Sequence, residues 1–305
     1  MKHEGEEKAK AAGVGYSIIA YIAWGLLPLY WKYLDKVSAF EILAHRIFWS
    51  FLFVAFLLML YRRWEPFKKA LLNRKIALAA FLSSVLISAN WFIYIWGVNN
   101  GHVIEASLGY YINPLLSVAL GVVVLKERLS RWQTMALMIA SIGVIILTVQ
   151  YGKIPWISFA LAITFGFYGL AKKKAQTEAL VGLALETVFM APLALGYIVF
   201  TEASGVGVIG LVSLPEMALL IGTGVVTALP LLWFAKGARS VPLSTMGFIQ
   251  YMAPTISLIL GIFVFKEVFT STHMISFAFI WCALLLYSLS YTSIAHTSRY
   301  GKARP

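Results

Sequence analysis

The chain contains 305 residues, of which 60% are hydrophobic and only 12% are charged. Because soluble domains average roughly 45–50% apolar and about 25% charged residues, this composition excludes an ordinary soluble domain. The net charge of +12 does not indicate a nucleic-acid-binding protein, since the basic residues lie in short segments between long apolar runs. With Cys282 as its single cysteine, the chain cannot form an intrachain disulfide.

Ten apolar runs are long enough to cross a bilayer as helices, which takes roughly 17–25 residues. In chain order they predict transmembrane helices at 13–33, 39–61, 76–98, 103–125, 132–150, 155–171, 179–200, 215–235, 242–265 and 272–293. The first run is long and leads directly into the second, which favours an uncleaved span over a signal peptide. The predicted fold class is therefore an all-α integral membrane protein with ten transmembrane helices.

The lysines and arginines between these spans favour one orientation. If the N-terminus is cytoplasmic, 20 of the 25 basic residues lie on the cytoplasmic side, four lie outside and Arg46 lies within a span. Positive residues are enriched in the cytoplasmic loops of membrane proteins. This distribution predicts that both tails, 1–12 and 294–305, are cytoplasmic.

One stretch of the chain occurs twice, 140 residues apart and without a gap. The first copy contains Gly97, Tyr111, Pro114, Ser117, Gly121, Lys126 and Glu127, and the second contains Gly237, Tyr251, Pro254, Ser257, Gly261, Lys266 and Glu267. The copies divide the chain into two five-helix repeats, 13–150 and 154–293. Because five is odd, the second repeat starts on the opposite side of the membrane, so the repeats are predicted to be inverted. Inverted repeats are typical of secondary transporters, which hold substrate between them.

Pro114 and Pro254 lie inside the fourth and ninth predicted spans. Proline has no N–H to bond the carbonyl four residues earlier, here the carbonyls of Tyr110 and Gln250. Such a carbonyl must find another partner or line a hydrated cavity. We therefore interpret these spans as kinked helices that line a central cavity, with Asn113 on the same face. The alternative is that proline and small residues here only permit close helix packing.

Aromatic and amide side chains recur in the spans that would face this cavity. Together with Tyr110, Asn113 and Gln250, the predicted substrate-binding residues are Trp24, Asn90, Trp91, Tyr94, Tyr168 and Tyr251. Rings combined with a few amides suit a planar or amphipathic organic solute. Aromatic residues also fill membrane-protein interiors and form interfacial belts, so each ring has an alternative structural role. Trp31 and Trp156 lie near span ends, which favours a belt role for both.

Four ionisable residues lie within the second and seventh spans: Glu41, His45, Arg46 and Glu186. Such groups are costly in a bilayer and usually face the helix bundle or water. Glu41 and His45 are one helical turn apart and could pair. Arg46 could recognise a substrate carboxylate or tie spans together through hydrogen bonds, and Glu41 or Glu186 could carry a coupling proton. Plain capping or packing roles are the open alternatives.

Residues 205–210 read Gly-Val-Gly-Val-Ile-Gly, which matches G-x-G-x-x-G. A dinucleotide site also requires a preceding strand, a following helix and an acidic residue about 20 positions later, whereas this stretch lies in a predicted outside loop. The sequence contains neither a P-loop motif nor a His/Cys cluster typical of a metal site. We therefore expect no catalytic residues, cofactor, metal or direct ATP use.

Five segments together identify a family resemblance: Ala23-Trp-Gly-Leu-Leu-Pro-Leu-Tyr-Trp-Lys32, Glu41-Ile-Leu-Ala-His-Arg46, Asn90-Trp91, Glu105-Ala-Ser-Leu-Gly-Tyr110 and Gly247-Phe-Ile-Gln-Tyr251. With them, the chain resembles the RarD family of permeases, in the EamA-type branch of the drug/metabolite transporter superfamily. The resemblance covers about residues 13–293. It implies a bacterial cytoplasmic (inner) membrane protein that exports an amino acid, another metabolite or a chloramphenicol-like drug. It also implies a cavity lined mainly by spans one, three, four, six, eight and nine.

We therefore predict an ATP-independent secondary transporter that works by alternating access. Its expected partners are a small organic solute, the lipid bilayer and protons, with no nucleic acid, and the internal pseudo-dimer is expected to work as a monomer. Two alternatives stay open. One is a non-transporting membrane receptor or assembly subunit. The other is a membrane-embedded lipid-modifying enzyme, although the five scattered histidines count against it.

Overall fold

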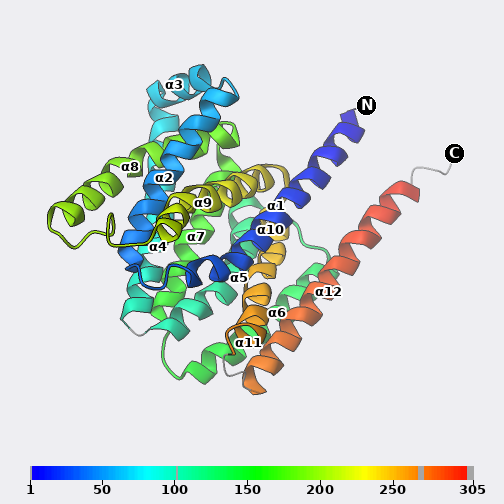
Figure 1. Ribbon diagram of the computed structural model, residues 1–305. Helices are drawn as coiled ribbons and strands as arrows, with labels where there is room; N and C mark the ends of the chain where they lie inside the picture. Colours follow the sequence, from blue (N-terminus) through cyan, green and yellow to red (C-terminus); the bar gives the residue numbers. More distant parts are fainter. Residues whose placement is uncertain (1, 101, 267–270, 301–305) are drawn as a thin grey trace.

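The computed structural model describes residues 2–100, 102–266 and 271–300, and every regular element in these ranges is a helix (Figure 1). In chain order the helices are α1 (Lys2–Lys32), α2 (Ala39–Leu60), α3 (Trp64–Leu72), α4 (Arg74–Asn99), α5 (Val103–Leu125), α6 (Arg131–Tyr151), α7 (Trp156–Lys174), α8 (Ala179–Ala203), α9 (Leu214–Ser240), α10 (Leu243–Gln250), α11 (Met252–Phe263) and α12 (Ser271–Tyr300). Glu267 of the sequence repeat, with Met1 and residues 301–305 of the predicted tails, lies outside the described residues. The start of α1 and the end of α12 lie on the same side of the bundle, as an even number of membrane crossings requires.

Nine segments of the described chain are helical, long and apolar enough to cross a bilayer, with α10 and α11 counted as one. They coincide with nine of the ten predicted spans, so the prediction of an all-helical membrane protein is confirmed. The predicted span 155–171 coincides with α7, which is helical but is not among the nine. The last turn of α7 consists of Lys172, Lys173 and Lys174, whose charges lower its mean hydropathy.

The structure differs from the predicted helices in three places. The predicted helix 242–265 is divided at Tyr251 into α10 and α11, three residues before Pro254. The interruption is local: proline offers no N–H to the Gln250 carbonyl, but Tyr251 keeps right-handed helical dihedrals (φ −61°, ψ −15°). Helix α5 continues through Pro114 without such an interruption. An additional short helix, α3, lies between the second and third predicted spans. The predicted tail 1–12 is helical from Lys2 onward and forms the first turns of α1.

Several helix ends follow local sequence signals. Ser130 caps α6 and Ser213 caps α9, and each serine forms a capping box with the residue three positions later. The serine hydroxyl accepts from a free backbone N–H of the first turn, while Gln133 or Glu216 accepts from the backbone N–H of the serine. These caps fix the starts of two spans from short-range sequence alone.

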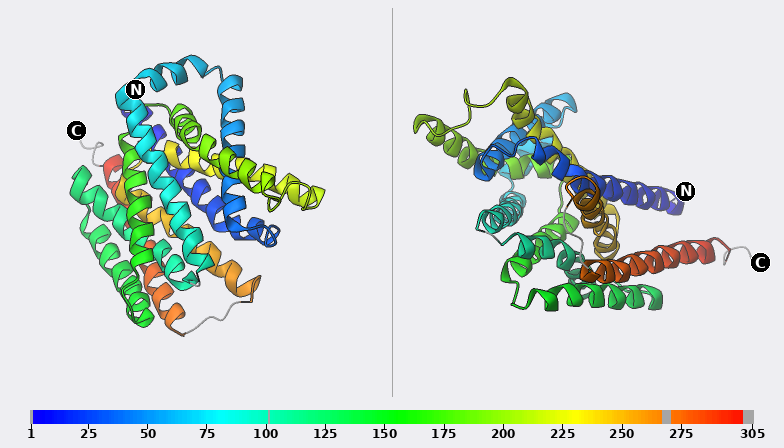
Figure 2. Two further views of the ribbon diagram at one scale, coloured as in Figure 1. Left: turned by 90° about the vertical axis from the view of Figure 1, so that its left-hand side faces the viewer. Right: turned by 60° about the horizontal axis from the view of Figure 1, so that its bottom comes forward.

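Helices from the two halves of the chain interleave. Helix α1 packs on α9 and α11, α7 packs on α5 and α4, and α2 packs on α8 and α9. Helices α6 and α12 lie side by side at one edge of the bundle (Figure 2). Helices approach one another closely at several glycines, for example Gly224 against Trp49 and Gly237 against Ser17. Small residues at such crossings let membrane helices approach closely.

The two proline-bearing spans cross near the centre of the bundle, where α10 packs on α5. At this crossing Gly247 lies against the Pro114 carbonyl and Val118, and a Cβ at Gly247 would lie 2.7 Å from the Pro114 oxygen. The segments that the sequence repeat predicts to be equivalent are therefore in direct contact.

Candidate functional site

Arg46 of α2 lies where four helices meet. Its guanidinium carbon is 4.2 Å from the ring centroid of Trp91 in α4 and 5.4 Å from that of Trp31 in α1. Its Nε donates a hydrogen bond of 3.2 Å to Oγ1 of Thr227 in α9. Two cation–π contacts and one neutral hydrogen bond hold the guanidinium in place, but they do not neutralise its charge.

Two tyrosines extend this group toward α5. The Tyr94 and Tyr110 rings meet edge to face, with centroids 5.7 Å apart, and both residues interact electrostatically with Arg46. Tyr94 is 37% exposed and Tyr110 is 47% exposed. The two rings therefore present accessible surface beside Arg46. We name as the arginine cluster the residues Trp31, Arg46, Trp91, Tyr94, Tyr110 and Thr227.

The fold thus brings together four residues singled out from the sequence, and it adds Trp31 and Thr227. The position of Trp31 near a span end favours an interfacial belt, but its ring faces Arg46 instead. Thr227 is one of two buried threonines in a mainly apolar stretch of α9, and a hydroxyl in such a stretch is the signal in the sequence that could have identified it. Neither contact follows from local periodicity, because the partners come from different helices.

Trp24 and Tyr168 belong to a separate aromatic group. The Trp24 ring lies 5.8 Å from Phe165 and 5.5 Å from Phe234, and the Tyr168 ring stacks on Phe234 at 5.8 Å. Tyr168 is fully buried, whereas Trp24 is partly exposed. This group joins α1, α7 and α9. Of Trp24 and Tyr168, both predicted to bind substrate, only Trp24 keeps accessible surface.

Asn90 ties α4 to α7. Its Nδ2 donates to the Leu161 carbonyl at 2.8 Å and to Oγ1 of Thr164 at 2.9 Å. Both amide hydrogens are therefore used within the protein. Asn90 lies next to Trp91 in the chain. Its hydrogen bonds to α7 therefore also help to fix the position of Trp91, which contacts Arg46.

Three further predicted residues lie around the break between α10 and α11. Gln250 is buried, and its Oε1 accepts from Ser117 at 3.2 Å and from Tyr21 at 3.5 Å. Tyr251 is also buried, and its hydroxyl donates to the Tyr111 carbonyl. Asn113 is 5% exposed, and its Oδ1 has no hydrogen-bond partner among the described residues. The structure places these residues between α1, α5 and the broken span.

Glu186 of α8 forms a buried ion pair with Lys172 of α7, at 2.6 Å between Oε1 and Nζ. The other oxygen of Glu186 accepts from the Tyr168 hydroxyl at 3.3 Å. The sequence places Lys172 at the end of a span beside two further lysines, which favours a solvated position. The structure instead buries Lys172, because Glu186 supplies its counter-charge.

Glu41 and His45 form a second buried group at the start of α2. His45 Nε2 lies 3.8 Å from Glu41 Oε2, and His45 Nδ1 accepts from the Trp49 indole N–H at 3.1 Å. Both residues are at most 3% exposed, and within the described chain neither Glu41 oxygen has a hydrogen-bond partner. Because Trp49 occupies Nδ1, the Nε2 atom of His45 carries the proton that faces Glu41.

Carboxylates near the two ends of α5 hold the first turns of other helices. Near its start, Glu105 accepts from the backbone N–H of Ile157 in α7 at 3.2 Å. Beyond its end, Glu127 accepts from the N–H groups of Leu243 at 2.7 Å and Ser244 at 2.8 Å, which open α10. Carboxylates are favourable there because unpaired N–H groups and the helix dipole make the N-terminus positive. Glu127 therefore joins the two halves of the chain at the C-terminal end of α5, whereas Tyr110 lies in the N-terminal half of that helix.

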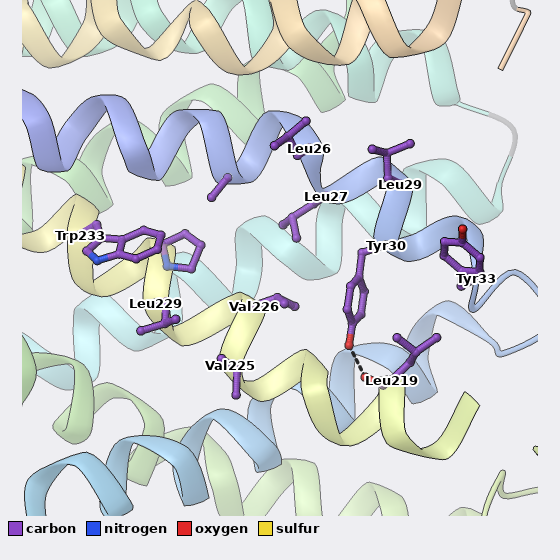
Figure 3. Close-up of a pocket in the computed structure, with 12 residues that line it drawn as sticks. Leu26, Leu27, Leu29, Tyr30, Tyr33, Leu219, Val225, Val226, Leu229 and Trp233 are labelled. Carbon is purple, nitrogen blue, oxygen red and sulfur yellow. Dashed lines mark hydrogen bonds between the residues drawn. The ribbon is translucent and has the colours of Figure 1, made fainter. Parts of the chain in front are cut away.

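Two cavities lie beside these groups. One, of about 490 Å³, runs between α1 and α9, and apolar residues such as Leu26, Val226 and Leu229 line most of it (Figure 3). Tyr30 crosses its floor and donates to the Leu219 carbonyl. The other is only about 30 Å³ and lies between Trp91, Thr227 and Glu186. Within the described chain, no group of three His, Cys, Asp or Glu residues could hold a metal ion.

Comparison with known proteins gives matches along most of the chain. Residues 11–149 match the model of the EamA-like transporter family. The uncharacterized transporter YojE of Bacillus subtilis is 48% identical, over 95% of this chain and 96% of its own length. The protein RarD of Streptomyces exfoliatus is 44% identical, over 98% of this chain and 94% of its own length. A protein of known crystal structure superposes with a TM-score of 0.69 at 18% identity, covering 92% of this chain and 98% of its own, which supports the fold.

Proposed function

The chain belongs to the EamA-like transporter family, and we propose that it is a secondary transporter that moves a small organic solute by alternating access. The observation that carries the proposal is the arginine cluster, in which a guanidinium contacts aromatic rings and a hydroxyl from other helices and two neighbouring rings keep accessible surface. Transporter sites combine a concave aromatic wall with a few polar groups in this way. We place this transporter in the bacterial cytoplasmic membrane, because the relatives named above are bacterial proteins.

The pattern of helix contacts supports ten spans arranged as two inverted repeats, 13–150 and 154–293. If α7, α8, α9, α10 with α11, and α12 are the counterparts of α1, α2, α4, α5 and α6, the most extensive helix contacts each have a counterpart. The contact of α1 with α9 then corresponds to that of α7 with α4, and α1 with α11 corresponds to α7 with α5. Contacts of α2 with α8 and of α6 with α12 map onto themselves. A pseudo-twofold axis in the membrane plane has this property.

We infer a state that is open toward the start of α5 and closed at its other end. Tyr94 and Tyr110 keep their exposed surface near the start of α5. Glu127 closes the opposite end by bonding the first turn of α10. With both termini in the cytoplasm, as the basic residues favour, the proposed state would be outward-open. Exchange of the two repeats' conformations would open the other side.

The residues that we propose to contact the solute first are Arg46, Trp91, Tyr94 and Tyr110. Trp24 presents part of its ring toward the same interior, whereas Asn90 and Gln250 already bond neighbouring helices. Asn113, Tyr168 and Tyr251 are buried, so they would act on the solute only after the repeats rearrange.

We assign proton coupling, if transport is coupled, to Glu41 and His45. Tyr197 of α8 interacts electrostatically with Glu41, and Glu202 at the end of α8 does so with His45. The Glu41→Gln variant should keep solute exchange but lose any response to an imposed pH gradient. Glu65→Gln, which changes an exposed carboxylate of α3, is the matched control. An unchanged response in Glu41→Gln would remove Glu41 from this role.

Counterflow in proteoliposomes tests the proposed function. Purified protein is reconstituted and screened with radiolabelled amino acids, organic acids, their amides and chloramphenicol-like drugs. We expect uptake above protein-free liposomes for at least one class, strong loss of uptake in Trp91→Ala, and normal uptake in Trp132→Ala, which changes an exposed tryptophan of α6. If folded protein moves nothing in the panel, the transporter proposal fails and a receptor or assembly subunit is favoured.

A further inference from the structure

Arg46 carries a charge that the described protein does not balance. Among the described residues, no carboxylate forms an ion pair with Arg46, and the only hydrogen bond from its guanidinium goes from Nε to Thr227. The two Nη atoms, which form the fork that suits a carboxylate, donate to no described residue. An arginine in the interior of a membrane protein is costly, so such residues pair or serve a ligand.

Arg46 differs from the residue at the corresponding position of the second half, because that residue has an ion-pair partner. Glu186 lies 140 residues after Arg46, which is the spacing of the sequence repeat. Glu186 is also a buried ion, but Lys172 lies 2.6 Å away and balances it. Both residues meet a hydroxyl from the adjacent helix: Thr227 of α9 at Arg46, and Ser83 of α4 at Glu186. One half of the molecule thus supplies its own counter-ion, and the other half does not.

The surroundings of Arg46 restrict what could supply the missing charge. Trp91 and Trp31 cover the guanidinium with ring surface, so the group is held in place and partly shielded from water. Tyr94 and Tyr110 offer further ring surface beside it. A partner must therefore be small enough to enter the bundle, carry an oxyanion for the Nη atoms and present a flat or apolar body to the rings.

We propose that the transported solute is an organic carboxylate with a planar or apolar body, and that Arg46 binds its carboxylate. This inference rests on the proposed function and names its substrate class. A solute whose only charge is the carboxylate would be driven outward by an inside-negative membrane potential. At about 100 mV the outward accumulation of a monovalent anion is roughly fifty-fold at equilibrium, so export needs no proton.

Acid and amide pairs test the inference, because they share a body and differ in charge. The probes are benzoate with benzamide and phenylacetate with phenylacetamide, measured by thermal stabilisation of purified protein and by counterflow. In the wild-type protein we expect at least one acid to bind ten-fold or more tightly than its amide. Arg46→Gln should abolish that preference, and Arg46→Lys should retain part of it. Arg131→Gln, which removes an exposed charge of α6, should behave as the wild type.

A second variant guards against misfolding of the arginine variants. Thr227→Val removes the hydrogen bond that orients Arg46 but keeps the charge, so we expect acid binding to weaken several-fold and the preference over the amide to persist. If no acid is preferred over its amide, or if Arg46→Gln keeps the preference while folded, the inference is overturned. Transport of amides or neutral drugs in that case would leave the proposed function standing. Absence of all transport would overturn both.

Discussion

The hydroxyl of Tyr251 donates a hydrogen bond of 3.3 Å to the backbone carbonyl of Tyr111, and the two tyrosines hold the same position in the two sequence copies. Residues related by a twofold axis can touch only where that axis passes between them. The contact therefore lies where the proposed pseudo-twofold axis would run, at the crossing of α5 with the broken span. It joins the residue at the break between α10 and α11 to the unbroken helix α5.

Replacing Tyr251 with phenylalanine tests the strength of this contact. The ring is kept and the hydrogen bond is lost, so we expect the free energy of unfolding to fall by about 1 kcal/mol. Thermal unfolding in detergent measures the change. Tyr33→Phe, at a tyrosine that is 70% exposed, should have no effect. Equal stability of the two variants would mean that the Tyr251–Tyr111 bond contributes nothing to the packing of the repeats.

Glu127→Gln should weaken the closed end of the bundle. The glutamine loses the charge that favours the N–H groups of Leu243 and Ser244, a loss of about 2 kcal/mol from the closed state. The equilibrium should then shift toward opening at that end by roughly thirty-fold. The readout is labelling of Ser117→Cys by an impermeant maleimide, in a background in which exposed Cys282 is replaced by serine.

The matched control for this variant is Glu65→Gln, which removes an exposed carboxylate of α3 and should leave the labelling rate unchanged. If Glu127→Gln also leaves the rate unchanged, Glu127 does not hold the closed end, and its two hydrogen bonds act only as a helix cap.

Gly247→Ala should separate the two crossing helices. The new Cβ would lie 2.7 Å from the Pro114 carbonyl and 2.8 Å from Val118, so α5 and α10 must move apart at a cost of about 1–3 kcal/mol. Melting temperature measures the cost. Gly15→Ala in α1 meets no atom within 4 Å and should be neutral or stabilising. A Gly247→Ala protein as stable as Gly15→Ala would contradict the crossing geometry.

The buried pair of Lys172 and Glu186 should be far more sensitive to loss of one partner than of both. Lys172→Met leaves a buried carboxylate unpaired, which should cost roughly 3–5 kcal/mol. The double variant Lys172→Met with Glu186→Leu should recover much of that loss, because no charge then lies in the interior. Lys174→Met, at an exposed lysine, serves as control. Additive losses in the double variant would show that the two charges are not coupled.

Much of the architecture could be predicted because it depends on local composition. Hydropathy alone gave nine of the bilayer-crossing segments with boundaries close to those of the helices, since burial in lipid requires long apolar runs with all backbone groups bonded within the helix. The Pro254 break followed from the missing N–H of proline, although the same signal at Pro114 leaves α5 unbroken. The repeat spacing also singled out the two spans that meet at Gly247, although not their contact.

The sequence by itself determined the membrane class, the long apolar helices and the sequence repeat, because each is encoded by neighbouring or regularly spaced residues. Only the tertiary structure decided which side chains meet: Trp31 and Thr227 at Arg46, Lys172 at Glu186, and the start of α10 at Glu127. These partners lie on different helices, often in different halves of the chain, and helix rotation and crossing position select them. Those quantities arise from close packing across the whole bundle, which no local pattern of residues specifies.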